Sequence, residues 1–177
     1  MENVATAISV VEAVFQELRA DPDPETIKNG VSQTVWPGRG QMISTSPPVL
    51  LDVAHNAGGA KALKDMLREV FGKKAKGILV WSSLADKEPD TFLKTLAPCL
   101  EEIVCVELQT PRAMAASSLM SAAERSGIPA ESCTLAEAKA ALQERVSKVD
   151  FGCIAGSVYL AGEWLSQENP DPGEHIQ

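Results

Sequence analysis

The sequence is poor in the side chains that build metal centres and disulfide frameworks. Its 177 residues include only four cysteines and two histidines. The cysteines form no CxxC pair, and none stands at a recognisable zinc-ligand spacing from a histidine. We therefore expect buried, reduced thiols, as in cytoplasmic proteins, and no metal site on this chain.

Basic residues and long apolar runs are also scarce. Sixteen Lys and Arg residues stand against 24 Asp and Glu residues, which gives a formal net charge of -8. Proteins that bind nucleic acid or membrane surfaces need a basic patch, so we expect neither partner. No run approaches the roughly 20 apolar residues of a membrane span, and the N-terminus has no signal-peptide pattern. These features predict a cytoplasmic protein and leave open a small anionic ligand.

Several catalytic motifs are missing as well. The chain has no P-loop GxxxxGK[ST], no GxSxG elbow, no HExxH and no strand followed by GxGxxG. It therefore offers no P-loop backbone cradle for the β- and γ-phosphates of a nucleotide.

The pattern of the first 35 residues predicts two short helices. Apolar residues recur at helical spacing over residues 3–19, and the sequence DPDPE then ends that helix. Asp23 and Pro24 supply the N-cap and first turn of a second helix that runs to about Gln33. Two such helices bury little together, so we expect them to be a lead-in to a larger structure.

From residue 49 to about 167, expected strands and helices alternate. This rhythm indicates βαβ units, and hence an α/β fold in three layers: a mostly parallel sheet with helices on both faces. Residues 41–45 alternate as an edge strand does, and 49–54 form a continuous apolar run typical of a central strand. The later strands are expected at 76–83, 101–108, 131–135 and 150–156, and the helices at 56–71, 88–97, 116–126, 135–147 and 157–167.

Polar residues follow several of these strands, at the edge where α/β proteins bind ligands. Asp52 ends a buried strand and needs either a donor from the protein or a ligand hydroxyl. His55 and Asn56 come at a helix N-terminus, which favours an anion. Simpler roles stay open: Asp52 and Asn56 can be helix caps, His55 can be structural, and Gly156–Ser157 can be a turn with a cap.

Six stretches, in a fixed order along nearly the whole chain, carry a family resemblance. They are ENVATAISVVEAV (2–14), WPGR (36–39), PPVLLDVAHNA (47–57), LADKE (84–88), TPRAM (110–114) and GSVYLAGEWL (156–165). Together they resemble the C-terminal domain of the folylpolyglutamate synthase and dihydrofolate synthase family, within the Mur-type ligases. The resemblance implies a Rossmann-like domain that closes over ATP and helps to bind glutamate.

The same resemblance implies a reaction and a partner domain. Such ligases use ATP and Mg²⁺ to activate a carboxylate of folate or dihydropteroate as an acyl phosphate, which the amine of glutamate then attacks. An N-terminal P-loop domain carries most of the magnesium ligands. By this likeness, residues 1–35 are the end of that ATPase domain, 36–168 are the Rossmann-like domain and 169–177 are a flexible tail.

The resemblance also implies roles for individual residues. Asn3 matches an adenine contact, Arg39 lies near the ATP phosphates, and Asp52 binds the ATP ribose. His55 lies near the phosphates or the incoming amino acid, so Arg39 and His55 are the expected catalytic residues. The expected substrate-binding residues are His55, Ser157 and Tyr159.

The chain departs from the family pattern at three points. Gly40 replaces a large apolar residue, Ala57 replaces a proline, and the P-loop domain is absent from the sequence. The chain is therefore expected to be inactive alone. Two alternatives stay open: a stand-alone binding or interaction domain, and a Mur-type ligase acting on another amino acid.

Overall fold

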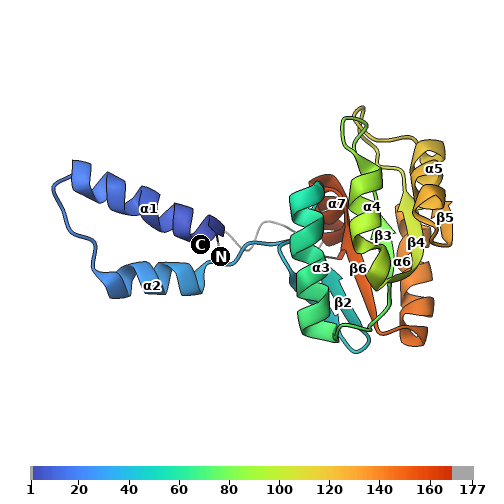
Figure 1. Ribbon diagram of the computed structural model, residues 1–177, viewed down its shortest axis with the longest axis horizontal. Helices are drawn as coiled ribbons and strands as arrows, with labels where there is room; N and C mark the ends of the chain where they lie inside the picture. Colours follow the sequence, from blue (N-terminus) through green and yellow to red (C-terminus); the bar gives the residue numbers. More distant parts are fainter. Residues whose placement is uncertain (1, 169–177) are drawn as a thin grey trace. The chain divides into compact units, whose positions relative to one another are not determined.

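The computed structural model describes residues 2–168, with side chains described from Val4 to Gln167. The chain divides into two compact units, Met1–Pro37 and Gly38–Gln177 (Figure 1). The expected tail, 169–177, lies outside the described residues.

The first unit is a helical hairpin of α1 (Glu2–Glu17) and α2 (Pro24–Gln33). Both helices were predicted. Asp23 is the N-cap of α2, where its carboxylate accepts hydrogen bonds from the backbone N–H groups of Glu25 and Thr26. No described side chain from Val4 to Pro37 is buried, so this hairpin has no core of its own.

The second unit is built on a six-stranded sheet in the order β1-β2-β6-β3-β4-β5. All neighbouring strands are parallel except β1 and β2, which form an antiparallel pair at one edge. The strands are β1 (Gln41–Thr45), β2 (Pro48–Leu51), β3 (Gly77–Trp81), β4 (Leu100–Val106), β5 (Ala130–Cys133) and β6 (Phe151–Ala155).

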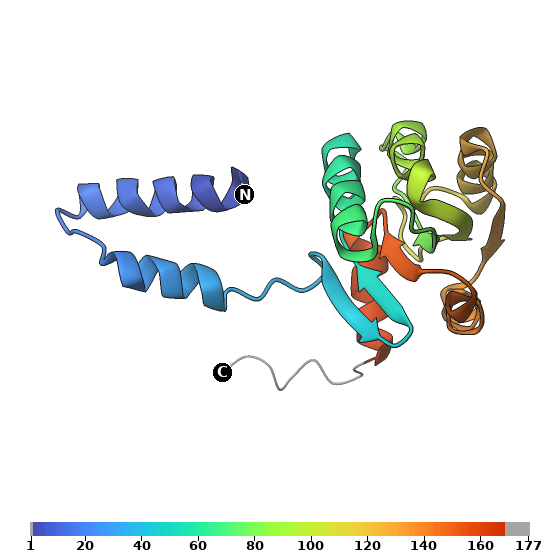
Figure 2. The ribbon, with the colours of Figure 1, turned by 60° about the horizontal axis from the view of Figure 1, so that its bottom comes forward.

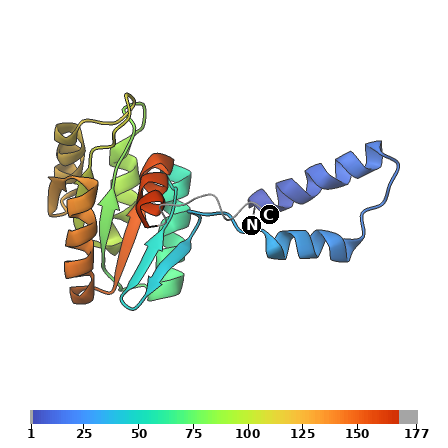
Figure 3. The ribbon, with the colours of Figure 1, turned by 180° about the vertical axis from the view of Figure 1, so that it is seen from behind.

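Helices cover both faces of this sheet. In Figures 2 and 3, α3, α4 and α5 lie along one face and α6 and α7 along the other. The predicted three-layer α/β fold with a mostly parallel sheet is confirmed. The helices are α3 (Ala57–Phe71), α4 (Pro89–Leu96), α5 (Ala116–Ser126), α6 (Leu135–Arg145) and α7 (Val158–Glu168), with short 3₁₀ turns η1 (Ala97–Cys99) and η2 (Val146–Lys148).

The sequence of the central strands explains the two cores. Every residue of β3 and β6 is buried, as expected for strands that helices cover on both faces. Alternate side chains enter opposite cores: Leu79 packs with α3, α4 and α5, whereas Ile78 and Val80 pack with α6 and α7. No helix in the described part of the chain is long and apolar enough to cross a membrane.

The four cysteines are unpaired thiols. Cys99, Cys105 and Cys153 are buried as expected, but Cys133 is only half-buried because it lies on the edge strand β5. Burial, with a smaller contribution from Cys133, raises the pKa of the Cys105 thiol to about 12. Burial likewise raises the pKa of Cys153, so these two groups are un-ionised at neutral pH.

Candidate functional site

The carboxyl ends of β2 and β6 meet at one edge of the sheet. Two hydrogen bonds extend their pairing beyond the strands: Asp52 N–H donates to the Ile154 carbonyl at 2.9 Å, and Gly156 N–H donates to the Ala54 carbonyl at 2.8 Å. These bonds bring the segment that carries Asp52 and His55 beside the segment that carries Ser157.

The order of the strands creates a crevice at the same edge. β6 lies between β2 and β3, and the helix after β6 covers one face of the sheet whereas the helix after β3 covers the other. Such a topological switch point separates the loop that follows β6 from the loop that follows β3, and it is the usual ligand site of open α/β sheets.

A pocket of about 190 Å³ lies at this switch point. Its walls come from the segments that follow β2, β3, β4 and β6. The lining residues are His55, Leu84, Lys87, Arg112, Gly156, Ser157, Val158 and Tyr159. The structure therefore brings together His55, Ser157 and Tyr159, the three residues expected to bind substrate.

Gly156 is required by the close approach of β3 to β6. Its φ is +107°, and a Cβ atom there would stand 2.2 Å from the Ser82 carbonyl oxygen and 2.6 Å from Trp81 Nε1. Only glycine fits this backbone. The turn places Ser157 directly before α7, where its Oγ accepts a hydrogen bond from Tyr159 N–H at 3.1 Å, so the turn-and-cap role of Gly156–Ser157 is confirmed.

His55 and Asn56 have different roles although they are neighbours. The Oδ1 of Asn56 accepts a hydrogen bond from Gly59 N–H at 2.8 Å and makes Asn56 the N-cap of α3. The Nδ1 of His55 lies 2.9 Å from the Val53 carbonyl. Because a carbonyl only accepts, the proton of a neutral ring is on Nδ1. The other nitrogen, Nε2, is then left as an acceptor for a ligand.

Asp52 has partners from the protein on both of its oxygens. Its Oδ2 accepts a hydrogen bond from Gly40 N–H at 2.8 Å, and its Oδ1 accepts one from Ala54 N–H at 2.7 Å. Gly40 has a φ of +58°, a conformation that disfavours the large side chain usual in the family. The acid at the end of β2 therefore has a structural role, and its contact with the ATP ribose stays a prediction.

The other expected nucleotide residues lie outside the pocket. Arg39 is exposed, and its loop is tied to the Asp52 segment because Val53 N–H donates to the Gly38 carbonyl at 2.7 Å. Asn3 lies in α1, but its side chain is outside the described residues.

Two pocket residues, Lys87 and Arg112, were not predicted as site residues. They come from the stretches LADKE and TPRAM, which carry the family resemblance, and the basic residue in each was the available signal. Together with His55 they give the pocket three side chains that can carry positive charge. A pocket of this kind suits a small carboxylate or phosphate.

Asp86 stands outside the pocket lining and balances this charge. Its carboxylate accepts two hydrogen bonds from Arg112 Nη2, at 3.1 and 3.2 Å. Partial desolvation raises the pKa of Asp86, but hydrogen bonds from its own backbone N–H and from Arg112, with the charges of Arg112 and Lys87, outweigh it and lower the pKa.

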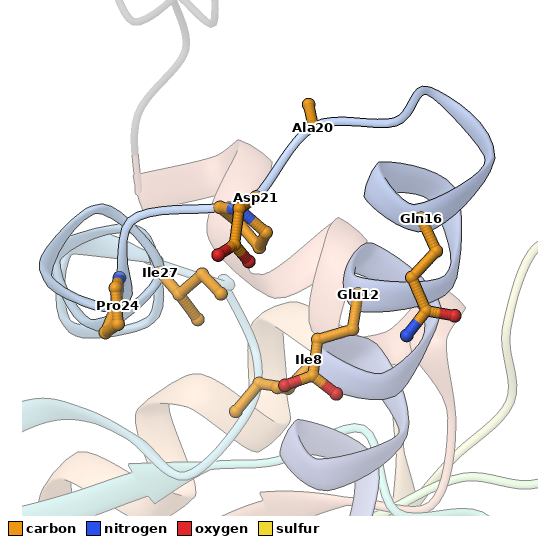
Figure 4. Close-up of a pocket in the computed structure, with 8 residues that line it drawn as sticks. Ile8, Glu12, Gln16, Ala20, Asp21, Pro24 and Ile27 are labelled. Carbon is orange, nitrogen blue, oxygen red and sulfur yellow. The ribbon is translucent and has the colours of Figure 1, made fainter.

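A larger hollow, of about 570 Å³, lies within the helical hairpin. Figure 4 shows Ile8 and Glu12 of α1 and Ile27 of α2 around it. Its lining is apolar and acidic apart from the amide of Gln16, with no basic or nucleophilic side chain. We regard it as the gap between two loosely packed helices rather than as a catalytic site. No group of three His, Cys, Asp or Glu side chains in the described residues could hold a metal ion.

Comparison with known proteins identifies the second unit. Residues 38–158 match the family model described as "Mur ligase, glutamate ligase domain". The chain belongs to this family. The matched range contains Arg39, Asp52 and every residue of the pocket lining except Tyr159.

The similar proteins are the ligases that the sequence resembles. The chain is 31% identical over 123 residues to the dihydrofolate synthase/folylpolyglutamate synthase of Bacillus subtilis. The matched region covers 70% of this chain and 28% of the relative. A folylpolyglutamate synthase of Mycobacterium tuberculosis, solved with ADP and AMPPCP, superposes with a TM-score of 0.82 at 30% identity over 94% of this chain and 39% of that chain.

A third similar protein was solved with a nucleotide analogue and a metal. It is the bifunctional folylpolyglutamate synthase/dihydrofolate synthase of Yersinia pestis, complexed with AMPPNP and a manganese ion. It has a TM-score of 0.73 at 26% identity and covers 88% of this chain and 37% of that chain. The resemblance to this ligase family is thus confirmed, and the chain spans well under half the length of these relatives.

Proposed function

We propose that this chain is the amino-acid-binding part of an ATP-dependent ligase that joins glutamate to folate or dihydropteroate. The observation that carries the proposal is the pocket at the β6–β3 switch point, with Lys87, Arg112 and His55 in its walls. Its position within the Mur ligase, glutamate ligase domain supports the same conclusion.

The pocket provides what an amino-acid substrate requires. Lys87 and Arg112 can hold carboxylate groups through charge-assisted hydrogen bonds. The Nε2 of His55, as an acceptor, can hold or receive a proton of the amine that attacks the acyl phosphate. The Tyr159 side chain is 46% exposed and can cover the entrance, which would exclude water from a reactive acyl phosphate.

The nucleotide would lie beside this pocket, against the Arg39 loop. Arg39 is exposed and can neutralise phosphate charge, and each Asp52 oxygen keeps a second lone pair for a ribose hydroxyl. When bound, ATP supplies the phosphoryl group and Mg²⁺ neutralises its charge. The resemblance assigns most magnesium ligands to the P-loop domain.

We propose further that residues 1–35 belong structurally to that P-loop domain. The hairpin buries none of its described side chains, and Val10, Val14 and Leu18 are among its exposed apolar residues. The match to the M. tuberculosis enzyme covers 94% of this chain, more than the second unit alone can supply, so it includes most of the hairpin.

A chimaera tests the proposed function. The 177 residues would replace the matching 39% of the M. tuberculosis folylpolyglutamate synthase, and ligation of labelled glutamate would be measured with ATP, Mg²⁺ and a folate. We expect ligation by the chimaera and none by the isolated chain. A folded chimaera that hydrolyses ATP but cannot use glutamate, or an isolated chain that ligates, contradicts the proposal.

Substitution of Arg39 in the active chimaera separates its catalytic role from a structural one. Arg39→Ala should lower turnover by on the order of 10²–10³, because one charge-assisted contact in a transition state is lost. The melting temperature should change little since the side chain is exposed. Lys73→Ala, which removes an exposed charge at the opposite edge of the sheet, is the control. Activity of Arg39→Ala within a few-fold of the unsubstituted chimaera would show that Arg39 has no catalytic role.

A further inference from the structure

The loops that follow β3 and β4 are joined directly beside the pocket. Leu84 and Ala113 form an isolated antiparallel bridge. Ala85 N–H donates to the Arg112 carbonyl at 2.9 Å, and Met114 N–H donates to the Ser83 carbonyl at 3.0 Å. The backbone of the two loops is therefore fixed without help from their charged side chains.

One carboxylate contacts both of the strong bases in these loops. Asp86 binds Arg112 Nη2 at 3.1 Å, and its Oδ2 lies 3.6 Å from Lys87 Nζ. Lys87 and Arg112 line the pocket, whereas Asp86 does not. The side chains of Asp86 and Arg112 are 53% and 57% exposed, and ion pairs of that kind contribute little to stability.

The arrangement fits a role in binding rather than in folding. The charged groups of Lys87 and Arg112 repel each other, and both long side chains have many rotamers. Without a countercharge, the two side chains would therefore adopt many conformations when the pocket is empty. A carboxylate behind them holds both near the pocket before a ligand arrives. Side chains ordered in advance lose less conformational entropy on binding.

We propose that Asp86 is a positioning residue, which sets the affinity of the pocket for its dicarboxylic amino acid by holding Lys87 and Arg112 at the pocket wall. Asp86 itself does not touch the substrate. The inference rests on the proposed function of this pocket and names a residue on which its affinity depends.

Removing the charge of Asp86 distinguishes this role from a simple electrostatic one. The probe is L-glutamate, titrated into the 177-residue chain and followed by NMR. Loss of a negative charge near an anion site should by itself tighten binding. If Asp86 positions the two cations, Asp86→Asn should instead weaken binding, by about ten-fold. The melting temperature should stay near that of the unsubstituted chain.

Three further variants complete the test. Asp86→Glu keeps the countercharge and should restore affinity to within about three-fold. The double variant Asp86→Arg, Arg112→Asp restores an ion pair between the loops but removes a cation from the pocket wall, so it should bind weakly. Asp65→Asn is the matched control, because Asp65 also pairs with a lysine, Lys61, on the exposed face of α3. It should leave glutamate affinity unchanged.

The outcomes separate the two claims. If the unsubstituted chain binds glutamate and Asp86→Asn binds it equally well or more tightly, the positioning role is wrong and the proposed function stands. If the double variant recovers full affinity, Asp86 merely joins the loops, and the positioning role is again wrong. If the unsubstituted chain binds no glutamate in this pocket, the proposed function fails and the positioning role fails with it.

Discussion

Gly40 and Asp52, twelve residues apart in sequence, are joined by a hydrogen bond of 2.8 Å from the glycine N–H to Oδ2 of the carboxylate. The second oxygen, Oδ1, accepts a hydrogen bond from Ala54 N–H. Asp52 therefore ties Gly40, the residue that follows Arg39, to the end of β2. Asp52, which the sequence predicts as a ligand contact, therefore has a structural function.

Replacement of Asp52 should reveal that structural function. Asn has one acceptor oxygen in place of two, so Asp52→Asn leaves one backbone N–H opposite an amide NH₂ group. We expect a loss of about 1–3 kcal/mol in the free energy of unfolding, measured by urea denaturation. Asp65→Asn on α3 is the control. A loss no greater than that of the control would mean that these bonds contribute nothing. The same variant of the active chimaera tests the contact with the ATP ribose. A higher Michaelis constant for ATP would show that Asp52 also contacts the ribose, and an unchanged constant would show that it does not.

Gly156 provides a test of the geometry at the pocket. Gly156→Ala should lower the free energy of unfolding by at least about 2 kcal/mol, because the new methyl group meets the Ser82 carbonyl at 2.2 Å in a backbone with positive φ. Gly72 has a similar φ of +103° but nothing within 4 Å of an added Cβ. Gly72→Ala should therefore show only the strain of the backbone, about 1 kcal/mol. Equal losses in the two variants would contradict the close approach of β3 and β6.

Acid stability should depend in part on the N-cap of α6. Hydrogen bonds from the backbone N–H and then the hydroxyl of Thr134 lower the pKa of Glu137 below its ordinary value of 4.5. A carboxyl group whose pKa is lower in the folded state than in the unfolded state stabilises the fold fully above its unfolded pKa. This stabilisation is lost as the pH falls through the folded pKa. Urea unfolding at pH 6 and pH 3 should therefore show a smaller acid-induced loss for Glu137→Gln than for the unsubstituted chain. A parallel pH dependence would contradict the capping contact, and Glu69→Gln on α3 serves as the control.

Local sequence patterns predicted most of the fold. Residues 116–126 form α5 as expected, and Asn56 caps α3, because helix periodicity and capping depend on residues a few positions apart. Strand ends were less accurate: the run 49–54 predicted a longer strand, whereas β2 ends at Leu51. Pairing with β6 continues only as single hydrogen bonds beyond that point.

The pocket could be predicted only in part. His55, Ser157 and Tyr159 stand in stretches that carry the family resemblance. Lys87 and Arg112 also stand in such stretches, LADKE and TPRAM, but they line the same pocket because β6 is inserted between β2 and β3, an order that no local pattern encodes. The bond between Gly40 and Asp52 was not predicted, because it depends on the positive φ of a residue twelve positions away.

We propose that the pocket at the β6–β3 switch point binds the amino-acid substrate. The most direct test of this proposal is an NMR titration of the 177-residue chain with L-glutamate, comparing Lys87→Ala with Lys73→Ala. Lys73 is an exposed lysine between α3 and β3, at the opposite edge of the sheet. We expect amide shifts centred on Gly156, Ser157 and Lys87, with affinity for glutamate reduced about ten-fold or more by Lys87→Ala and unchanged by Lys73→Ala. Saturable shifts elsewhere on the sheet, or equal affinities for the two variants, would contradict the proposal.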